Sequence, residues 1–320
     1  MQRKINALVT GGAGFIGSHL VDRLVNGGYN VKVLDNLSTG NLTNIQGHID
    51  SGQVEFVKGD ITQLEQVKAC LQGVDAVFHL AAQISVPLSV KNPEFTYQTN
   101  VTGTLNLLTS LAKQNPAGKF VFISSCAVYG EPQYLPVDEK HPTNPISPYA
   151  DSKLLGEYYT LGFHQNKLLK TAVLRFFNVY GIRQGLNDYS GVITKFIDRI
   201  KQNQPITIYG DGSQTRDFVH VSNIVDAIVA CMENPNAEGQ VFNVGTGKAL
   251  TIEDLAKNLI QLSGASSTIN HAPAREGDIK FSYANITKAS TMLNYKPTMP
   301  LNHGLHELLA AANALNLQKQ

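Results

Sequence analysis

The chain has 320 residues, and its 26 lysines and arginines almost balance its 25 aspartates and glutamates, which gives a formal net charge of +1 at pH 7. Without a surplus of positive charge, neither nucleic acid nor an anionic membrane is expected as the main partner. Three cysteines without paired or metal-type spacing argue against a disulfide framework, and no stretch is apolar for long enough to span a bilayer. We therefore expect a cytoplasmic protein with no bound metal.

Short apolar runs alternate with helical segments through the first half of the chain. Strands are expected at residues 5–10, 29–35, 54–58, 76–80, 119–124 and 171–176. Such alternation predicts an α/β fold with a Rossmann-type, doubly wound parallel sheet. Two longer helices, expected at 100–114 and 149–165, have apolar faces that would suit the contact surface of a homodimer.

The texture of the sequence changes after Asn178. Loops rich in Gly, Asn, Asp and Pro separate the helices expected there, which span residues 192–202 and 252–263. We expect residues 1–177 to form the Rossmann domain and residues 178–320 to form a smaller mixed α/β lobe. The run F-V-H-V at 218–221 is typical of a strand, which we expect to rejoin the first sheet, so a segment near 216–232 would return to the first domain.

A glycine-rich turn follows the first expected strand. The run T-G-G-A-G-F-I-G places Gly11, Gly14 and Gly17 at a spacing that lets backbone N–H groups and a helix N-terminus approach a pyrophosphate. Asp35 ends the second expected strand, where its carboxylate can accept hydrogen bonds from an adenosine ribose. An acid repels a 2′-phosphate and no arginine follows it, so the pattern favours NAD over NADP.

Tyr149 and Lys153 lie four residues apart in Y-A-D-S-K, which puts both side chains on one face of the helix expected there. A lysine ammonium beside a phenol favours the phenolate, so Tyr149 is the candidate base. Ser125 ends the run F-V-F-I-S-S, from which its hydroxyl would reach both the substrate and Tyr149. Beside NAD, these three residues form a set suited to coupled proton and hydride transfer.

Contacts with the cofactor are expected from the glycine turn, from the carboxyl ends of the strands and from the catalytic pair. These residues are Gly11, Gly14, Phe15, Ile16, Gly17, Asp35, Asn36, Leu37, Ser38, Gly40, Asp60, Ile61, Leu80, Ala81, Ala82, Gln83, Asn100, Ser124, Tyr149, Lys153 and Phe176. Together they follow the rule that ligands bind at the carboxyl edge of a parallel sheet.

Nearly from end to end, the motifs resemble those of the extended short-chain dehydrogenase/reductase family, in its nucleotide-sugar branch. The matching runs are T-G-G-A-G-F-I-G, L-D-N-L-S-T-G, H-L-A-A-Q, S-S-C-A-V-Y-G, Y-A-D-S-K, L-R-F-F-N-V-Y-G, R-D-F-V-H-V, F-N-V-G-T-G and R-E-G-D. The resemblance implies NAD as the cofactor, a UDP-sugar as the substrate, and residues 178–320 as the lobe that binds this substrate.

By the same resemblance, Asn178 would contact the substrate pyrophosphate, and Arg216 and Arg275 would hold its phosphates or the uridine ribose. Arginine suits phosphate recognition on charge and geometry alone. Tyr209 and Asp278 would border the nucleoside. The full set expected at the substrate site is Ser85, Ser125, Tyr149, Asn178, Val192, Tyr209, Arg216, Arg275, Asp278 and Ser282.

Members of this branch share hydride abstraction from sugar C4 and differ in the steps that follow. The 4,6-dehydratases of the branch carry an Asp-Glu pair where this chain has Cys126 and Ala127, and the UDP-glucuronate decarboxylases have a glutamate at the position of Ala127. Without an acid there, neither reaction has its proton donor. What remains is a UDP-sugar 4-epimerase, in which a 4-keto sugar turns over within the site and is reduced on its other face.

Ser282 stands where the resemblance places the wall beside the 2-substituent of the sugar. Tyrosine there is associated with plain hexoses and smaller residues with N-acetylated ones. We therefore expect UDP-GlcNAc and UDP-GalNAc as substrates, together with UDP-glucose and UDP-galactose. A UDP-glucuronate 4-epimerase, a dehydratase or net reductase of the same superfamily, and a non-enzymatic NAD-binding relative are the alternatives; the paired arginines and the intact Tyr149 and Lys153 argue against the reductase and the non-enzymatic relative.

Overall fold

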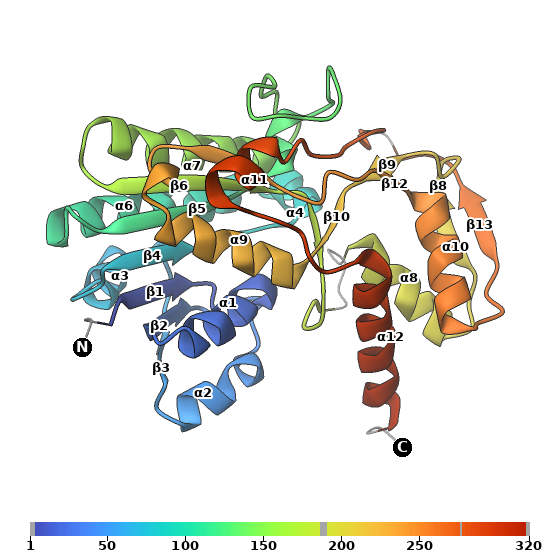
Figure 1. Cartoon of the computed structure of the whole chain (residues 1–320), viewed down its shortest axis with the longest axis horizontal. Helices are drawn as coiled ribbons and strands as arrows, with labels where there is room; N and C mark the ends of the chain where they lie inside the picture. The colour runs from blue at the N-terminus through green and yellow to red at the C-terminus, as the bar shows by residue number, and fades with distance from the viewer. Residues whose placement is uncertain (1–3, 186–190, 276, 318–320) are drawn as a thin grey trace.

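The computed structural model describes residues 4–185, 191–275 and 277–317. Its centre is one parallel sheet made of β1 (Asn6–Thr10), β2 (Asn30–Asp35), β3 (Val54–Lys58), β4 (Ala76–His79), β5 (Lys119–Ser125), β6 (Lys170–Phe176) and β11 (Val241–Val244). The seven strands lie in the order β11-β6-β5-β4-β1-β2-β3 (Figure 1). Because the order reverses between β1 and β4, the sheet has the switch point of a Rossmann-type fold, and the expected α/β class is confirmed.

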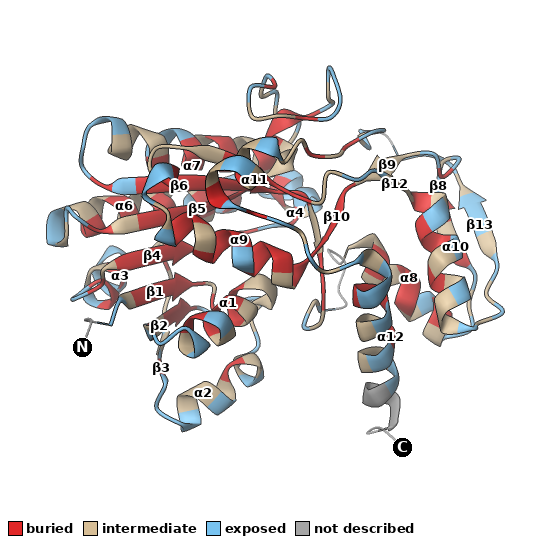
Figure 2. Ribbon diagram, viewed as in Figure 1, coloured by how far each residue is buried: buried red, intermediate tan, exposed pale blue. Residues whose placement is uncertain are grey.

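Helices cover both faces of this sheet. One face carries α1 (Phe15–Asn26), α9 (Val221–Glu233) and α11 (Thr287–Leu293), and the other carries α3 (Leu64–Cys70), α6 (Gly103–Gln114) and α7 (Pro148–Gln165). The strands between them are largely buried (Figure 2), which explains why they are continuous apolar runs in the sequence. Shorter segments connect these elements: α2 (Gln46–Asp50), α4 (Val86–Lys91), α5 (Pro93–Tyr97), η1 (Leu42–Asn44), η2 (Gln98–Thr102) and η3 (Cys126–Tyr129).

The two long helices expected from the sequence are present with small shifts at their ends. A turn of π-helix, η2, runs directly into α6. The helix α7 begins at Pro148 because Ser147 caps it: the serine hydroxyl accepts a hydrogen bond from the N–H of Ala150, and proline suits the first helical position. This cap fixes where the row of residues that starts at Tyr149 leaves the loop.

The chain returns to the sheet in a different way from the one expected. The run F-V-H-V does form a strand, β10 (Phe218–His220), but it pairs with β7 (Asn178–Tyr180) in a separate two-stranded sheet. The expectation that it rejoins the first sheet is wrong, because β6 already pairs with β5 on one side and with β11 on the other. The return is made by α9, which packs on the sheet, and by β11.

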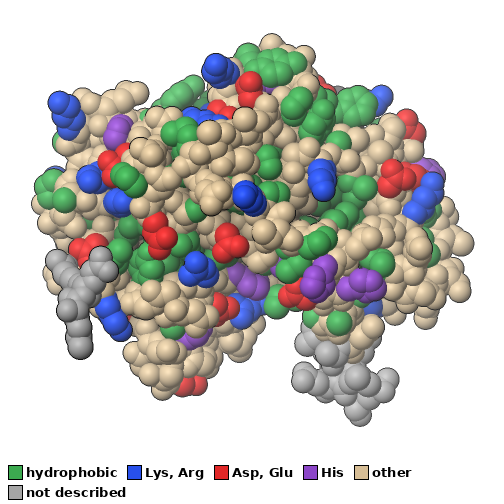
Figure 3. Space-filling model, in the orientation of Figure 1, with side chains coloured by type: hydrophobic (Ala, Val, Ile, Leu, Met, Phe, Trp, Pro, Cys, Tyr) green, Lys and Arg blue, Asp and Glu red, His purple; other side chains and the backbone are tan. Residues whose placement is uncertain are grey.

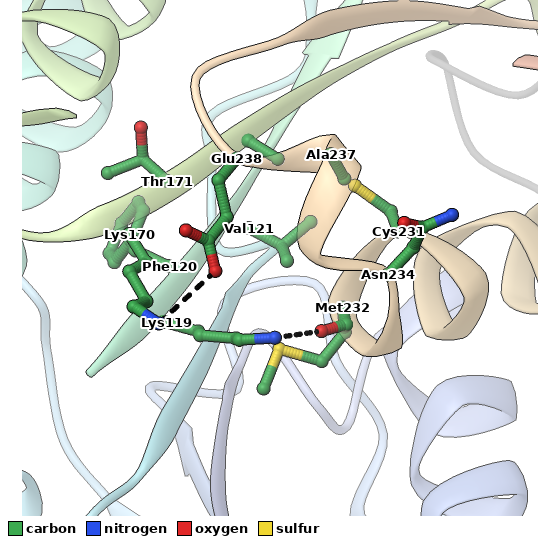
Figure 4. A pocket seen from close by; sticks show the side chains of 11 residues that line it. Lys119, Phe120, Val121, Lys170, Thr171, Cys231, Met232, Asn234, Ala237 and Glu238 are labelled. Atoms are coloured by element: carbon green, nitrogen blue, oxygen red, sulfur yellow. Dashed lines mark hydrogen bonds and ion pairs between the residues drawn. The ribbon is translucent and has the colours of Figure 1, made fainter. Parts of the chain in front are cut away.

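Two lysines fasten this returning segment at the amino ends of β5 and β6 (Figure 4). The Lys119 ammonium donates to the carbonyl of Met232 at 2.9 Å, and Lys170 lies 3.4 Å from the carboxylate of Glu238. The charged groups that line the hollow between these residues, Lys119, Lys170 and Glu238, therefore already have partners. Because ligands of a parallel sheet bind at the opposite, carboxyl edge, we interpret it as a structural seam.

The smaller part of the molecule has its own core. Residues from its helices and from β8 form a buried cluster that includes Ile197, Ile206 and Leu255. Its elements are α8 (Val192–Lys201), β8 (Ile206–Tyr209), β9 (Thr215–Arg216), β12 (Leu250–Thr251), α10 (Ile252–Ser263), β13 (Ile269–Ala272) and α12 (Leu301–Leu317), with η4 (Pro235–Ala237) on the side of the large sheet. Figure 1 shows this part beyond the carboxyl edge of the large sheet.

None of the described helices combines the length and apolar character needed to cross a bilayer. On the face drawn in Figure 3, lysines and arginines are interspersed with acidic side chains. The three cysteines are free thiols.

We predict that Gly156→Ala destabilises the protein, because a Cβ at this position in α7 would overlap the ring of Phe122 on β5. Overpacking of this kind costs about 1–3 kcal/mol. The control is Gly162→Ala in the same helix, where no atom lies within 4 Å of the added Cβ and the change should stabilise by up to about 1 kcal/mol. Urea unfolding measures both, and equal effects of the two substitutions would contradict this packing.

Candidate active site

The glycine turn between β1 and α1 leaves no room for side chains. Gly11 has a φ of +72°, and a Cβ on it would lie 2.8 Å from the backbone nitrogen of Ala81. A Cβ on Gly17 would overlap the carbonyl oxygen of Gly11. The helix then starts at Phe15 without a side-chain cap, so the N–H groups of its first turn face the carboxyl edge of the sheet, where an anion can accept their hydrogen bonds.

Asp35 lies directly beside this turn. Its carboxylate is buried and accepts hydrogen bonds from the N–H groups of Ala13 at 2.9 Å and Leu37 at 2.8 Å. A Cβ on Gly40 would stand 3.1 Å from both carboxylate oxygens, so a larger residue at position 40 would crowd them. Each carboxylate oxygen keeps a lone pair, as the predicted ribose contact requires.

A hydrogen bond between Asn36 and Asp60, two of the residues expected to contact the cofactor, joins the ends of β2 and β3. Asn36 donates to the Asp60 carboxylate at 2.9 Å, and the N–H and hydroxyl of Thr62 donate to its other oxygen. These hydrogen bonds hold the pKa of Asp60 below its usual value although partial burial acts to raise it. The Ser38 N–H bonds Asn36, and Ile61 is packed against Gly103 at the start of α6.

The loop after β4 holds Gln83 in a fixed position. Leu80, Ala81 and Ala82 lead to it along the sheet edge, and the amide of Asn100 both accepts from the Gln83 N–H at 2.7 Å and donates to the Gln83 carbonyl at 2.9 Å. Asn100 therefore supports this loop, since its side chain is buried and also bonds Ser152. The Oε1 atom of Gln83 is buried and has no protein partner.

Ser125 and Tyr149 meet at the carboxyl end of β5. Burial raises the pKa of the Tyr149 phenol to about 12, and the nearby Ser125 hydroxyl acts in the opposite direction. The phenol is therefore protonated at neutral pH in this structure. The lowering expected from Lys153 is not seen, because the Lys153 ammonium donates to the carbonyl of Ile123 at 2.9 Å.

Lys153 is almost completely buried under this pair. Burial lowers the pKa of its ammonium to about 8, and the negative charge of Glu157 opposes that shift. The ammonium also lies 5.1 Å from the centre of the Phe122 ring. A lysine whose pKa is this close to neutral can lose or hold its proton at small energetic cost.

Two predicted cofactor residues have other tasks in the structure. The Ser124 hydroxyl donates to Glu157 and is buried, so only its backbone remains for a ligand. Phe176 ends β6 next to Ser125 and is buried between β5 and β11. Both residues therefore shape the sheet edge from within.

Part of the predicted substrate set surrounds the turn that follows Ser125. The charge on Arg216 interacts with Cys126, Glu131 and Asp278, and burial lowers the arginine pKa. Asn178 has a buried Oδ1 without a protein partner. Arg216 and Asn178 are close because β7 and β10 pair, with the Asn178 N–H bonded to the carbonyl of residue 217.

The remaining members are spread around the edge of the smaller lobe. The Arg275 guanidinium stacks 3.7 Å from the ring centre of Tyr209, which is exposed. Ser282 is buried, and its N–H bonds the carbonyl of Thr215. Ser85 caps α4 by accepting from the Leu88 N–H. Two more lie at element ends, Val192 at the start of α8 and Asp278 in the loop after β13.

Two buried carboxylates near the site, Glu157 and Asp217, were not expected from the sequence. Glu157 lies four residues after Lys153 in α7 and pairs with Arg175 at 2.6 Å. Asp217 accepts hydrogen bonds from the N–H groups of Thr246, Gly247 and Ala284. The spacing Y-x3-K-x3-E was a usable signal for Glu157, whereas the partners of Asp217 are too distant in the sequence to be recognised.

Comparison with known proteins agrees with this geometry. The family model for GDP-mannose 4,6 dehydratase matches residues 8–308. A Methanocaldococcus jannaschii protein, named provisionally as a UDP-glucose 4-epimerase, is 42% identical over 304 residues, which is 94% of this chain and 96% of that one. The UDP-N-acetylglucosamine 4-epimerase of Methanobrevibacter ruminantium M1, solved with UDP-N-acetylmuramic acid, is 35% identical with a TM-score of 0.92 over 98% of this chain and 100% of its own.

A third relative was solved with its cofactor. The UDP-glucuronic acid 4-epimerase of Bacillus cereus, in complex with UDP-glucuronic acid and NAD, is 35% identical with a TM-score of 0.90 over 97% of this chain and 100% of its own. The chain therefore belongs to the family of the GDP-mannose 4,6 dehydratase model, the extended short-chain dehydrogenases/reductases. Within that family it is an enzyme of the UDP-sugar 4-epimerase type.

NAD is the cofactor of this family, and the residues of this chain fit it. The glycine turn offers backbone N–H groups to a pyrophosphate, and Asp35 offers carboxylate lone pairs to a ribose. The buried Oε1 of Gln83 lacks a partner that a bound molecule would supply, since buried polar atoms are seldom left without a hydrogen bond.

We predict that Asp35→Asn lowers the affinity for NAD by about tenfold, because a hydrogen bond to a charged acceptor is weakened. The ratio of the NADP to the NAD dissociation constant should also fall, because an amide does not repel a 2′-phosphate. Titration calorimetry with both nucleotides measures the ratio of their dissociation constants. Asp254→Asn is the control, since this residue lies beside the N-cap of α10 in the smaller lobe. An unchanged ratio in Asp35→Asn would refute the assignment of this carboxylate.

Proposed function

We propose that this protein is an NAD-dependent UDP-sugar 4-epimerase that inverts C4 through a 4-keto intermediate. The observation that carries the proposal is the placement of Ser125 beside the buried phenol of Tyr149 at the carboxyl end of β5, with the buried Lys153 one turn further along α7. Together with a bound hydride acceptor, one hydroxyl, one phenol and one cation are sufficient for reversible oxidation of a secondary alcohol. No further acid is required for the return step.

In this mechanism, Ser125 and Tyr149 hold the 4-hydroxyl of the sugar between them. In its phenolate form, Tyr149 would accept the hydroxyl proton as the alcohol is oxidised and give the proton back when the other face of the ketone is reduced. The chemistry that NAD supplies when bound is the reversible acceptance of the C4 hydride. Lys153 provides a positive charge beneath the reacting groups. By itself it does not lower the pKa of Tyr149, and the positive charge of bound NAD would add to it in favouring the phenolate.

The turn after Ser125 favours simple epimerisation over elimination or decarboxylation. By the family resemblance, the sugar dehydratases carry an Asp-Glu pair at the positions of Cys126 and Ala127, and the UDP-glucuronate decarboxylases carry a glutamate at the position of Ala127. Ala127 has no titratable group, and burial raises the pKa of the Cys126 thiol to about 11. A thiol that stays protonated is a poor base at neutral pH, so a C5 proton would not be removed by this turn.

For the sugar we propose UDP-GlcNAc and UDP-GalNAc, with UDP-glucose and UDP-galactose also accepted. Ser282 supports this choice, because it is a small residue at the position expected beside the 2-substituent. Its backbone is held by Thr215, and Tyr283 is bonded to Val137, so this wall is attached on both sides. A wall fixed in this way sets the space for the 2-substituent by the size of its side chain.

We further propose that residues 1–177 bind NAD and residues 178–320 bind the UDP-sugar, in a cytoplasmic homodimer. Two exposed tyrosines on α7, Tyr158 and Tyr159, support the dimer, since large aromatic side chains on a helix surface are common at protein interfaces. The exposed Val90 and Phe95 lie on α4 and α5, which contact α7 and extend this surface. A second copy of the chain would cover it by helix packing.

We predict that Tyr149→Phe lowers kcat by at least about a hundredfold while NAD stays bound, because a phenyl ring has no proton to exchange. Turnover is followed by proton NMR with UDP-GlcNAc, and bound nucleotide is measured after denaturation. Tyr159→Phe, an exposed tyrosine of the same helix, is the matched control and should keep full activity. Wild-type turnover in Tyr149→Phe would rule out the mechanism.

We predict that purified protein, without added NAD, converts UDP-GlcNAc and UDP-glucose to their galacto-configured epimers. Ser282→Tyr should lower kcat/KM for UDP-GlcNAc by about tenfold or more relative to UDP-glucose, because the added ring fills space beside the 2-substituent. UDP-glucuronate is the third substrate of the panel. Faster conversion of UDP-glucuronate than of both others would overturn the proposed substrate, and an unchanged ratio in Ser282→Tyr would overturn the role of this wall.

A further inference from the structure

Glu157 is a buried carboxylate whose four hydrogen bonds, from Ser124 and Arg175, no step of the mechanism uses. The Ser124 hydroxyl donates to Oε1 at 2.5 Å, and Arg175 donates through Nε at 2.9 Å and through Nη2 at 2.6 Å. The side chains of Glu157 and Arg175 are 2% and 6% exposed. Desolvating such a pair costs several kcal/mol, so the pair is expected to have a role beyond stabilising the fold.

The Glu157 carboxylate connects α7, which carries Tyr149 and Lys153, to β5, which ends in Ser125. Tyr149, Lys153 and Glu157 are spaced by four residues along α7 and therefore form one row on one face of the helix. Ser124, which bonds Glu157, immediately precedes Ser125 on β5. One carboxylate thus links the row that carries the phenol to the strand that carries the hydroxyl.

The same ion pair also reaches the turn after Ser125. The guanidinium of Arg175 lies 4.7 Å from the ring centre of Tyr129, the last residue of η3. The Tyr129 hydroxyl donates to Asn243 at 2.6 Å, and Asn243 sits opposite Arg175 in the pairing of β11 with β6. The ion pair therefore contacts Ser124, which precedes Ser125, through Glu157, and Tyr129, which follows it, through Arg175.

Glu157 is also the acid next to the buried Lys153 ammonium. Of the other titratable groups around Lys153, His79 on β4 is neutral, because burial lowers its pKa to about 3, and Tyr149 is a protonated phenol. Arg175 on β6 is paired with Glu157 itself. The negative charge of Glu157 raises the pKa of Lys153 against the effect of burial.

We propose that Glu157 is a positioning residue for the reaction, which holds Lys153 and the Ser124–Ser125 end of β5 in their working arrangement through its buried bonds to Ser124 and Arg175. This inference rests on the proposed function, because the catalytic roles of Lys153 and Ser125 belong to that function. It differs from a purely structural role in that the carboxylate charge acts on Lys153.

The first test reads Lys153 without any turnover. Protein labelled with carbon-13 at the ε position of lysine is titrated by NMR in the absence of NAD, and Lys153→Arg identifies the signal. The midpoint for Lys153 should lie near 8 in the wild type and fall by about one pH unit in Glu157→Gln, because a nearby negative charge is removed. An unmoved midpoint in folded Glu157→Gln overturns the inference.

The second test is the pH profile of kcat with UDP-GlcNAc. Glu157→Gln should lower kcat by about tenfold at pH 7.5 with KM changed by less than about twofold, and the alkaline limb should move to lower pH. Glu238→Gln is the matched control, because it breaks an ion pair with Lys170 at the opposite end of the same sheet. A limb that stays at the wild-type pH overturns the inference.

Glu157→Gln leaves Arg175 buried and unpaired, which could prevent folding. The variant Glu157→Gln/Arg175→Gln removes both charges, and it should fold and show the same acid shift of Lys153 and of the kcat limb. A folded double variant with the wild-type midpoint and limb would reduce the pair to a structural role. Wild-type protein that turns over none of the UDP-sugars would instead reject the proposed function, so the two failures are distinguishable.

Discussion

The close approach of α7 to β5 is the constraint on which the rest of the site depends. The helix can lie against the strand only because Gly156 has no side chain where it meets the ring of Phe122. From this contact, the row of Tyr149, Lys153 and Glu157 reaches the carboxyl end of the strand, where Ser125 stands. Hydrogen bonds weaken steeply when their lengths and angles change. The packing of apolar groups therefore determines whether the hydroxyl and the phenol can act together.

The buried carboxylate of Asp217 fixes the arrangement of the loops beside the smaller lobe. The carboxylate of Asp217 is inaccessible to solvent and receives N–H groups from Thr246, Gly247 and Ala284, which come from two separate loops. Burial raises the pKa of Asp217, and these hydrogen bonds oppose the rise. Arg216 precedes Asp217 directly, so the arginine that is proposed to bind phosphate is held by the residue that joins those loops. In the proposed mechanism, Arg216 fixed in this way would hold the phosphates of the substrate while the sugar turns over within the site.

Local patterns were sufficient to predict the strands up to β6, because each is a short apolar run next to a turn, and to predict that Tyr149 and Lys153 lie on one helix and that Ser125 ends a strand. The pairing of β11 with β6 and of β10 with β7 was not predictable, because strand partners are chosen by packing over long sequence distances. The same holds for the bonds of Asp217. The pKa of Tyr149 also differed from expectation, since spacing along a helix does not reveal that Lys153 bonds the carbonyl of Ile123.

Two buried oxygens show what this arrangement costs before a ligand arrives. The Oε1 of Gln83 and the Oδ1 of Asn178 have no protein partner, and each unsatisfied buried polar atom costs about 1–3 kcal/mol. The Gln83 backbone is fixed by Asn100 and that of Asn178 by β10, so neither side chain is brought to a protein donor by movement of its backbone. A molecule that supplies the missing donors, directly or through water, regains this energy on binding. Under the proposed assignment of Gln83 to the cofactor site and Asn178 to the substrate site, the stability given up at these two atoms becomes affinity.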